Sequence, residues 1–107
     1  MASKAGEITE EEVALIVVQI AAERRDGIAS FDLIREEVPK RYRLSAADLA
    51  QSVTRPNEAM WEQKIRNIKS HFEVQGNFIY EGYLEHVPGV GYRVTDRGRK
   101  LARRYAA

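Results

Sequence analysis

The segment that decides the fold is WEQKIRNIKSHFEVQGNFIY, which runs from Trp61 to Tyr80. Its apolar residues recur at intervals of three and four, which places them on one face of an α-helix. This face consists of Trp61, Ile65, Ile68 and Phe72. Gly76 suits the left-handed conformation in which helices often end. The pattern predicts a long helix over residues 58–75, packed against a core through its apolar face.

The polar face of this helix carries side chains that suit contacts to DNA bases. Arg, Asn and Gln have paired donors and acceptors that match the edges of guanine and adenine in the major groove. A helix exposed for solubility alone is more often rich in Glu–Lys pairs. We therefore predict that the helix contacts DNA through Gln63, Lys64, Arg66, Asn67 and Ser70. The alternative is an ordinary solvated face.

The residues after Gly76 have the aromatic and β-branched composition of strands. Pro88-Gly89-Val90-Gly91 predicts a hairpin loop, so residues 77–95 are expected to form a β-hairpin. This loop is not a phosphate-binding loop, because no helix starts directly after it. His86 and Arg93 lie on the predicted strands, and we expect them to contact the DNA backbone or the minor groove.

Upstream of the long helix, the sequence predicts three shorter helices. A capping box at Thr9 opens the first, which is expected to run to about Arg25. Ser30 caps the second, which is expected to end at Pro39. Ser45 opens the third, with an acidic residue three positions later as in a capping box.

Basic residues gather at two further places. The predicted connector after the second helix is a candidate phosphate clamp, or otherwise a solvated basic turn, and contains Lys40, Arg41 and Arg43. A last helix, capped by Thr95 or Asp96, contains the tripeptide Arg97-Gly98-Arg99. Arginines in such a tripeptide can enter a narrow minor groove. The favoured alternative is that Gly98 allows close packing of the helix.

The predicted order is helix, two short helices around a basic connector, long helix, hairpin, helix. It predicts a mainly α fold with a small β-hairpin, of the winged helix-turn-helix type. The 107 residues suffice for one domain with a single core. We expect a flexible leader at residues 1–8 and a single domain over residues 9–107.

Composition and charge narrow the function classes. The chain has no cysteine, which excludes disulfides and thiolate metal sites. Its longest apolar run is too short to cross a bilayer, and no export signal opens it, so we expect a cytoplasmic protein. Residues 1–37 hold four Lys/Arg and nine Asp/Glu, a net charge of −5, whereas residues 38–107 hold thirteen and seven, a net charge of +6. This asymmetry favours one surface for a polyanion.

The first helix is apolar nearly all round. Leu15 and Val18 lie opposite its main apolar stripe, and a helix of this kind is usually covered on both sides. In a small protein the second cover can be another copy of the chain. We therefore predict a homodimer interface that includes Leu15 and Val18.

Residues 43–101 resemble the winged-helix domain at the N-terminus of Mrr-type restriction proteins. The residues that carry the resemblance are Leu44-Ser45, Trp61, Ile65-Arg66, Ile68, Phe72, Gly76, Gly91-Tyr92-Arg93-Val94-Thr95 and Gly98-Arg99. The resemblance implies that the long helix reads double-stranded DNA. It also implies a small transcription regulator or an accessory factor of a restriction, defence or mobile-element system. The hairpin segment is longer than is usual in that family. The alternative is a protein–protein interaction module with the same fold.

No enzymatic chemistry is predicted. Glu62-Gln63-Lys64 has the E-x-K spelling of the nuclease that follows this domain in Mrr-type proteins, but on a helix the first and third residues diverge by about 200°. The two histidines, His71 and His86, have no carboxylate at a zinc-motif spacing. We expect no metal, no cofactor and no small-molecule substrate.

Overall fold

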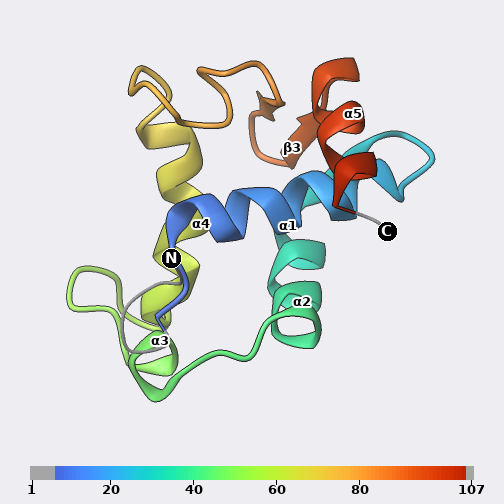
Figure 1. Cartoon of the computed structure of the whole chain (residues 1–107). Helices are drawn as coiled ribbons and strands as arrows, with labels where there is room; N and C mark the ends of the chain where they lie inside the picture. The colour runs from blue at the N-terminus through green and yellow to red at the C-terminus, as the bar shows by residue number, and fades with distance from the viewer. Residues whose placement is uncertain (1–6, 106–107) are drawn as a thin grey trace.

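The computed structural model of the chain describes residues 7–105 (Figure 1). These residues form five α-helices and a small three-stranded antiparallel sheet, in keeping with a mainly α fold. The elements in chain order are α1 (Glu10–Ala22), β1 (Ile28–Ser30), α2 (Phe31–Arg41), α3 (Ala46–Leu49), α4 (Met60–Ser70), β2 (Leu84–Val87), β3 (Gly91–Val94) and α5 (Asp96–Arg104). No helix in this part of the chain has the length and apolar character needed to cross a membrane.

Side-chain caps fix where four of the helices begin, as predicted. Ser30 caps α2, where its hydroxyl accepts from the Leu33 amide at 3.1 Å. The Thr9 hydroxyl accepts from the Glu12 amide at 3.0 Å, and the Glu12 carboxylate accepts from the Thr9 amide at 2.8 Å. This capping box satisfies amides that would otherwise lack a partner. The same reciprocal box opens α3 at Ser45. Thr95 accepts from the Gly98 amide at 2.9 Å and so caps α5.

The three strands pair in the order β1-β3-β2. Ile28 pairs with Arg93 on one side of β3, and Glu85 pairs with the same residue on the other side. Strand β1 was not predicted, because three residues are too few to show the alternation of a strand. Gly91 is required where β1 meets β3: a Cβ atom there would lie 1.9 Å from the Ala29 carbonyl oxygen.

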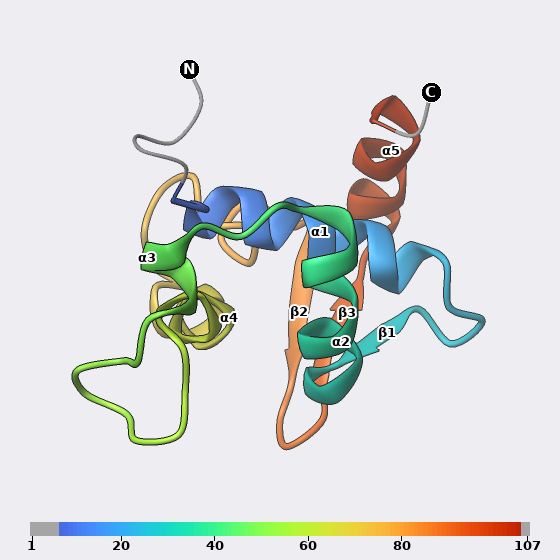
Figure 2. The same ribbon diagram turned by 90° about the horizontal axis from the view of Figure 1, so that it is seen from below.

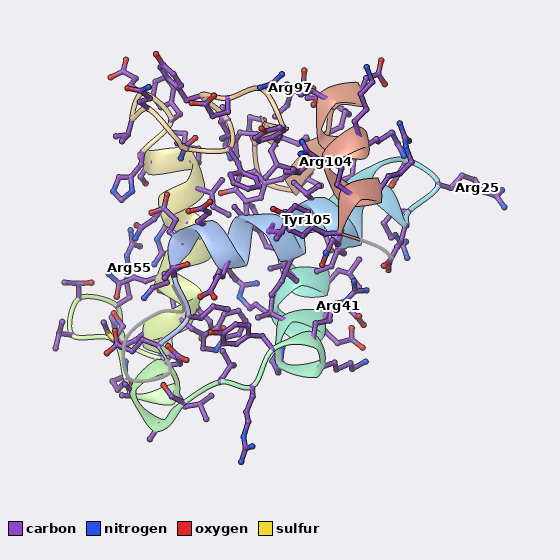
Figure 3. All side chains as sticks on the ribbon, viewed as in Figure 1. Arg25, Arg41, Arg55, Arg97, Arg104 and Tyr105 are labelled. Carbon is purple, nitrogen blue, oxygen red and sulfur yellow. The ribbon has the colours of Figure 1, made fainter. Side chains whose placement is uncertain are left out.

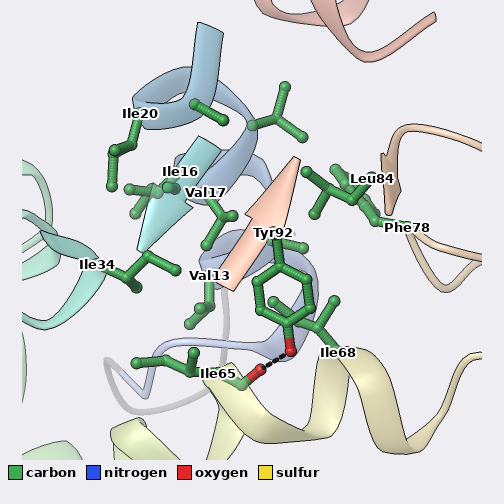
Figure 4. Close-up of a cluster of buried hydrophobic side chains, with 14 of the residues drawn as sticks. Val13, Ile16, Val17, Ile20, Ile34, Ile65, Ile68, Phe78, Leu84 and Tyr92 are labelled. Atoms are coloured by element: carbon green, nitrogen blue, oxygen red, sulfur yellow. Dashed lines mark hydrogen bonds between the residues drawn. The ribbon is translucent and has the colours of Figure 1, made fainter. Parts of the chain in front are cut away.

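Helix α1 lies at the centre of the molecule and contacts α2, α4, α5, β1 and β3. Its residues meet side chains from the other helices, the sheet and the segment before β2 in one buried cluster (Figure 4). Helix α5 covers the side of α1 that the dimer prediction had left open. Val18 is therefore fully buried within the monomer and cannot be an interface residue. Leu15 is half-buried beside Leu101 and Tyr105 of α5, and a homodimer contact there stays a prediction.

Helix α2 does not end at Pro39. Proline removes one amide donor near the end of the helix, but the helix continues for two residues, and the Tyr42 amide donates to the Val38 carbonyl at 2.9 Å. Lys40 and Arg41 consequently lie in the last helical turn and not in a connector.

Helix α4 is shorter than the predicted 58–75. It ends at Ser70, where the side-chain amide of Asn77 donates to the Ile68 carbonyl at 2.8 Å. The chain then follows turns, so Phe72 leaves the apolar face and is 47% exposed. The Asn77 side-chain oxygen also accepts from the amides of Ile79 and Tyr80, which holds residues 78–80 in a turn rather than in the predicted strand.

The prediction of a flexible leader over residues 1–8 is wrong for Ile8, which is held in place. Residues 1–6 lie outside the described residues, but Ile8 is buried, and its amide donates to both carboxylate oxygens of Asp48 at 3.1 and 3.3 Å.

The β2–β3 loop and α5 project to different sides of α1, although β3 itself contacts α5. Figure 2 shows α5 on one side of α1, and the β2–β3 loop together with the segment 50–59 on the other. This arrangement separates α5, which carries the candidate minor-groove arginines, from the hairpin loop.

Candidate nucleic-acid interface

The exposed face of α4 is the candidate site. Trp61, Ile65 and Ile68 are buried against the core, so the other side of α4 points away from α1. Lys64, Asn67 and Ser70 are spaced three residues apart, which makes them neighbours along the helix surface. Within the described part of the chain, their side chains form no hydrogen bond or ion pair, and their polar groups are available to a partner.

Gln63, by contrast, has a structural contact. Its side-chain oxygen accepts a hydrogen bond from the Ser52 hydroxyl at 2.8 Å. Ser52 is buried, and its hydroxyl also accepts from the amides of Thr54 and Arg55. Gln63 therefore helps to hold the segment 50–59 against α4.

Arg66 is also engaged within the protein. Its two Nη atoms donate to the two carboxylate oxygens of Glu58, and the Nη1–Oε2 distance is 2.9 Å. The hydrogen bond from Arg66 lowers the pKa of Glu58, and the same bond raises the pKa of Arg66. This two-pronged geometry is the one in which arginine binds planar acceptors. The guanidinium that was predicted to read bases is thus already paired.

The pair could not be predicted from the helical pattern, because that pattern places Glu58 inside the helix. Two residues eight apart on a straight helix are about 12 Å apart along the axis. Glu58 instead precedes α4, which begins at Met60, and the chain turns so that its carboxylate meets Arg66.

The candidate phosphate clamp at the end of α2 is likewise mostly paired. Lys40 lies 3.6 Å from Glu36 and 3.4 Å from Glu37. Arg41 donates to Glu23 at 2.7 and 3.1 Å and also to Glu37, which joins α2 to the end of α1. The hydrogen bonds from Arg41 lower the pKa values of both glutamates. Arg43 is exposed, with no side-chain partner among the described residues.

Two predicted site residues lie on the hairpin, and they point to opposite faces of the sheet: His86 on β2 and Arg93 on β3. Arg93 lies 3.5 Å from Glu85, its partner across the strands. His86 is half-buried, and its ring centre lies 5.8 Å from that of Tyr92. Burial is the main cause that lowers the pKa of His86, and the positive charge of Lys69 lowers this pKa further.

A hollow of about 170 Å³ separates α4 from α2 and the hairpin. Its walls include Phe31 and Arg35 of α2, Glu62 and Lys69 of α4, and His86 and Tyr92 of the hairpin. The Tyr92 hydroxyl donates to the Ile65 carbonyl at 2.6 Å and ties the hairpin to α4 (Figure 4). Lys69 is exposed here beside the predicted site residues. Lys69 lies three residues after Arg66 on the same helix, and this spacing could have predicted it as a further site residue.

Arg97 and Arg99 do not join this site, because α5 lies across α1 from the hairpin loop. The Arg97 Nε donates to the Glu81 carbonyl at 2.8 Å, and its guanidinium lies 5.0 Å from the Tyr83 ring centre. A Cβ atom at Gly98 would lie 2.2 Å from the Tyr83 carbonyl oxygen. Close packing therefore explains why residue 98 is glycine, which was the interpretation favoured from the sequence.

Comparisons with known proteins add no relative. No protein-family model matches the chain, and no significant match was found among curated proteins or solved structures. Residues 7–105 contain no group of three or more His, Asp or Glu side chains placed to hold a metal ion.

Proposed function

We propose that this protein binds double-stranded DNA as a winged helix, with α4 in the major groove and the β2–β3 hairpin on the flanking backbone. The observation that carries the proposal is the row Lys64, Asn67 and Ser70, whose polar groups are free of partners in the described chain. An amide and an ammonium group beside each other can bind base edges and phosphates.

The arrangement around α4 supports the same function. The element order has α2, α3 and α4 between β1 and the hairpin, and the hairpin strands share one sheet with β1. The loop of the hairpin and the segment 50–59 project on the same side of α1 (Figure 2). Lys69 and Arg55 are exposed on α4 and on that segment. A duplex bound to α4 would meet cations on both of its flanks.

The pairing with Glu58 determines whether Arg66 can contact DNA. A guanine edge and the Glu58 carboxylate offer similar pairs of acceptors to the guanidinium. Arg66 reads a base if Glu58 releases it, and otherwise it supports the segment 50–59. A role as a regulator or as an accessory factor of a defence or mobile-element system rests on the resemblance to Mrr-type proteins alone.

Salt-titrated binding to mixed duplexes tests the proposal. If about four to six phosphates are neutralised, log K falls against log salt with a slope of roughly −4 to −5. Asn67→Ala should cost about 1–3 kcal/mol on the preferred duplex and little on random DNA. Gln75→Ala, which removes an exposed amide from the turns after α4, is the matched control and should leave binding unchanged.

A protein-interaction module is the second candidate. The segment after α4 exposes Phe72, Val74 and Tyr80 at 47%, 57% and 56%, and clustered exposed apolar side chains often mark protein contacts. A salt slope near zero, or no binding at low salt, would favour this function over DNA binding.

A further inference from the structure

Helix α5 carries a basic face that the proposed α4 site does not use. Its nine residues contain five cations and one acid, Asp96. Three of the cations are exposed and, within the described part of the chain, have no side-chain partner: Lys100, Arg103 and Arg104. Helices exposed only for solubility usually balance such charges with acidic neighbours. A helix left this basic indicates a polyanionic partner.

The packing of α5 turns this basic face outward. Gly98 and Ala102 are buried and Leu101 is half-buried, because α5 packs on α1 and β3. The cations therefore project from the far side of the helix. Figure 2 shows that α5 lies across α1 from the hairpin loop, so this face is separate from the α4 side.

A hollow next to α5 extends the surface. It has a volume of about 460 Å³ and lies between α1, α2 and α5, with Ala22 and Ala102 on its floor. Arg99, Arg103 and, from α2, Arg41 line it. Its one acid, Glu23, is already bound by Arg41. Figure 3 shows Arg104 on α5 and Arg41 on α2, above and below α1.

Nucleic acid fits this surface better than a membrane does. Nine helical residues span about 13 to 14 Å, and a DNA duplex carries one phosphate charge per roughly 1.7 Å of its axis. Four of the five cations are arginines, whose planar fork suits phosphate oxygens. A helix that binds a membrane surface needs a broad exposed apolar face, whereas on the apolar side of α5 Gly98 and Ala102 are buried and Leu101 is half-buried.

We propose that α5 and the hollow beside it form a second backbone-binding surface, so that one molecule holds two duplexes, one on α4 and one on α5. This inference rests on the proposed function of the α4 face. Contact through α5 is independent of sequence, because it is made to phosphates.

Co-capture of two unlinked duplexes tests the inference. One duplex is attached to beads and the other is fluorescent, and the affinity of each variant for a single duplex is measured in parallel. Arg103→Gln/Arg104→Gln should lower co-capture about fivefold or more, since two phosphate contacts are lost, with a change in single-duplex affinity of less than about twofold. Arg24→Gln/Arg25→Gln removes the same charge from the exposed turn after α1 and should change neither quantity.

Several results would overturn the inference. Unchanged co-capture by Arg103→Gln/Arg104→Gln would assign bridging to something other than α5, such as a dimer with two α4 faces. An equal loss in the Arg24→Gln/Arg25→Gln control would show a general effect of net charge. No co-capture by the unaltered protein would also refute it.

A third variant separates this failure from failure of the proposed function. Lys64→Gln/Asn67→Ala should weaken single-duplex binding if α4 is the primary site. If that loss is seen without co-capture by the unaltered protein, the α4 function stands and the α5 inference fails. If Lys64→Gln/Asn67→Ala has no effect and Arg103→Gln/Arg104→Gln abolishes all binding, α5 is the sole site and both proposals fail.

Discussion

Arg66 and Glu58 face each other across the start of α4, with both Nη atoms of the arginine bonded to both oxygens of the carboxylate. Both side chains are partly exposed, at 35% and 14%. An ion pair at such a position stabilises a fold by about 0.2–1 kcal/mol. Its larger consequence is for binding, because Glu58 occupies the donors that Arg66 would offer to a base or a phosphate.

Removing the charge of Glu58 should therefore strengthen DNA binding. Glu58→Gln leaves a single acceptor oxygen and no charge, so Arg66 is released to the duplex. We expect about three- to tenfold tighter binding at fixed salt, measured by fluorescence anisotropy. Glu73→Gln removes the same charge at an exposed residue that has no side-chain partner among those described. An equal gain in both variants would show that net charge alone is responsible.

The stability of the protein should fall at high pH because of Tyr92. Burial raises the pKa of this fully buried tyrosine from 10.0 to about 12. Below pH 10 the hydroxyl is protonated in both folded and unfolded chains, and its contribution is complete. Between pH 10 and about 12 the unfolded chain loses this proton while the folded chain keeps it. Stability is then lost by up to about 1.4 kcal/mol per pH unit.

Tyr92→Phe isolates this effect. At pH 7 the variant should be about 1 kcal/mol less stable, because the hydrogen bond to the Ile65 carbonyl is lost. The difference should shrink as the pH of urea unfolding is raised from 9 to 11, since phenylalanine does not ionise. A constant difference for Tyr92→Phe would contradict the assigned pKa.

Local sequence signals predicted local structure well. Thr9, Ser45 and Thr95 cap their helices as expected, because a cap depends on residues three positions apart. The stripe Trp61, Ile65 and Ile68 is buried as predicted, since helical spacing alone places those residues on one face. These parts of the fold could be predicted from the chain itself.

The features that the sequence did not predict depend on distant partners. Strand β1 exists because β3 lies beside it, and α4 ends at Ser70 because Asn77 binds its last turn. The candidate site was affected in the same way. Of its predicted residues on α4, Gln63 and Arg66 are bound by Ser52 and Glu58, which the helical pattern could not place next to them.

The early end of α4 leads to a contrast between two aromatic residues that the pattern had treated alike. Trp61 is 4% exposed, and Trp61→Ala should lower the free energy of unfolding by about 3–5 kcal/mol. Phe72 is 47% exposed after the end of the helix, and Phe72→Ala should cost about 1 kcal/mol or less. Urea unfolding of both variants provides the measurement. Equal losses would mean that α4 continues past Ser70 with Phe72 in the core.

Asp48 joins the start of the described chain to α3. It is 2% exposed, and its carboxylate accepts from the Ile8 amide and, at 2.9 Å, from the Ser45 amide. A buried carboxylate with several amide donors is costly to remove, because each amide is then left without an acceptor.

Asp48→Ala should therefore lower the free energy of unfolding by about 2–4 kcal/mol. Two costs contribute: the loss of hydrogen bonds to the carboxylate, and a buried Ile8 amide that no longer has an acceptor. Asp48→Asn keeps one acceptor oxygen and should lose about half as much. The control is Asp32→Ala, which breaks an exposed pair with Arg35 and should cost about 0.5 kcal/mol or less. Hydrogen exchange gives the decisive reading, because protection of the Ile8 amide depends on the Asp48 carboxylate. If that amide stays protected in Asp48→Ala, the segment before α1 is held by the burial of Ile8 alone.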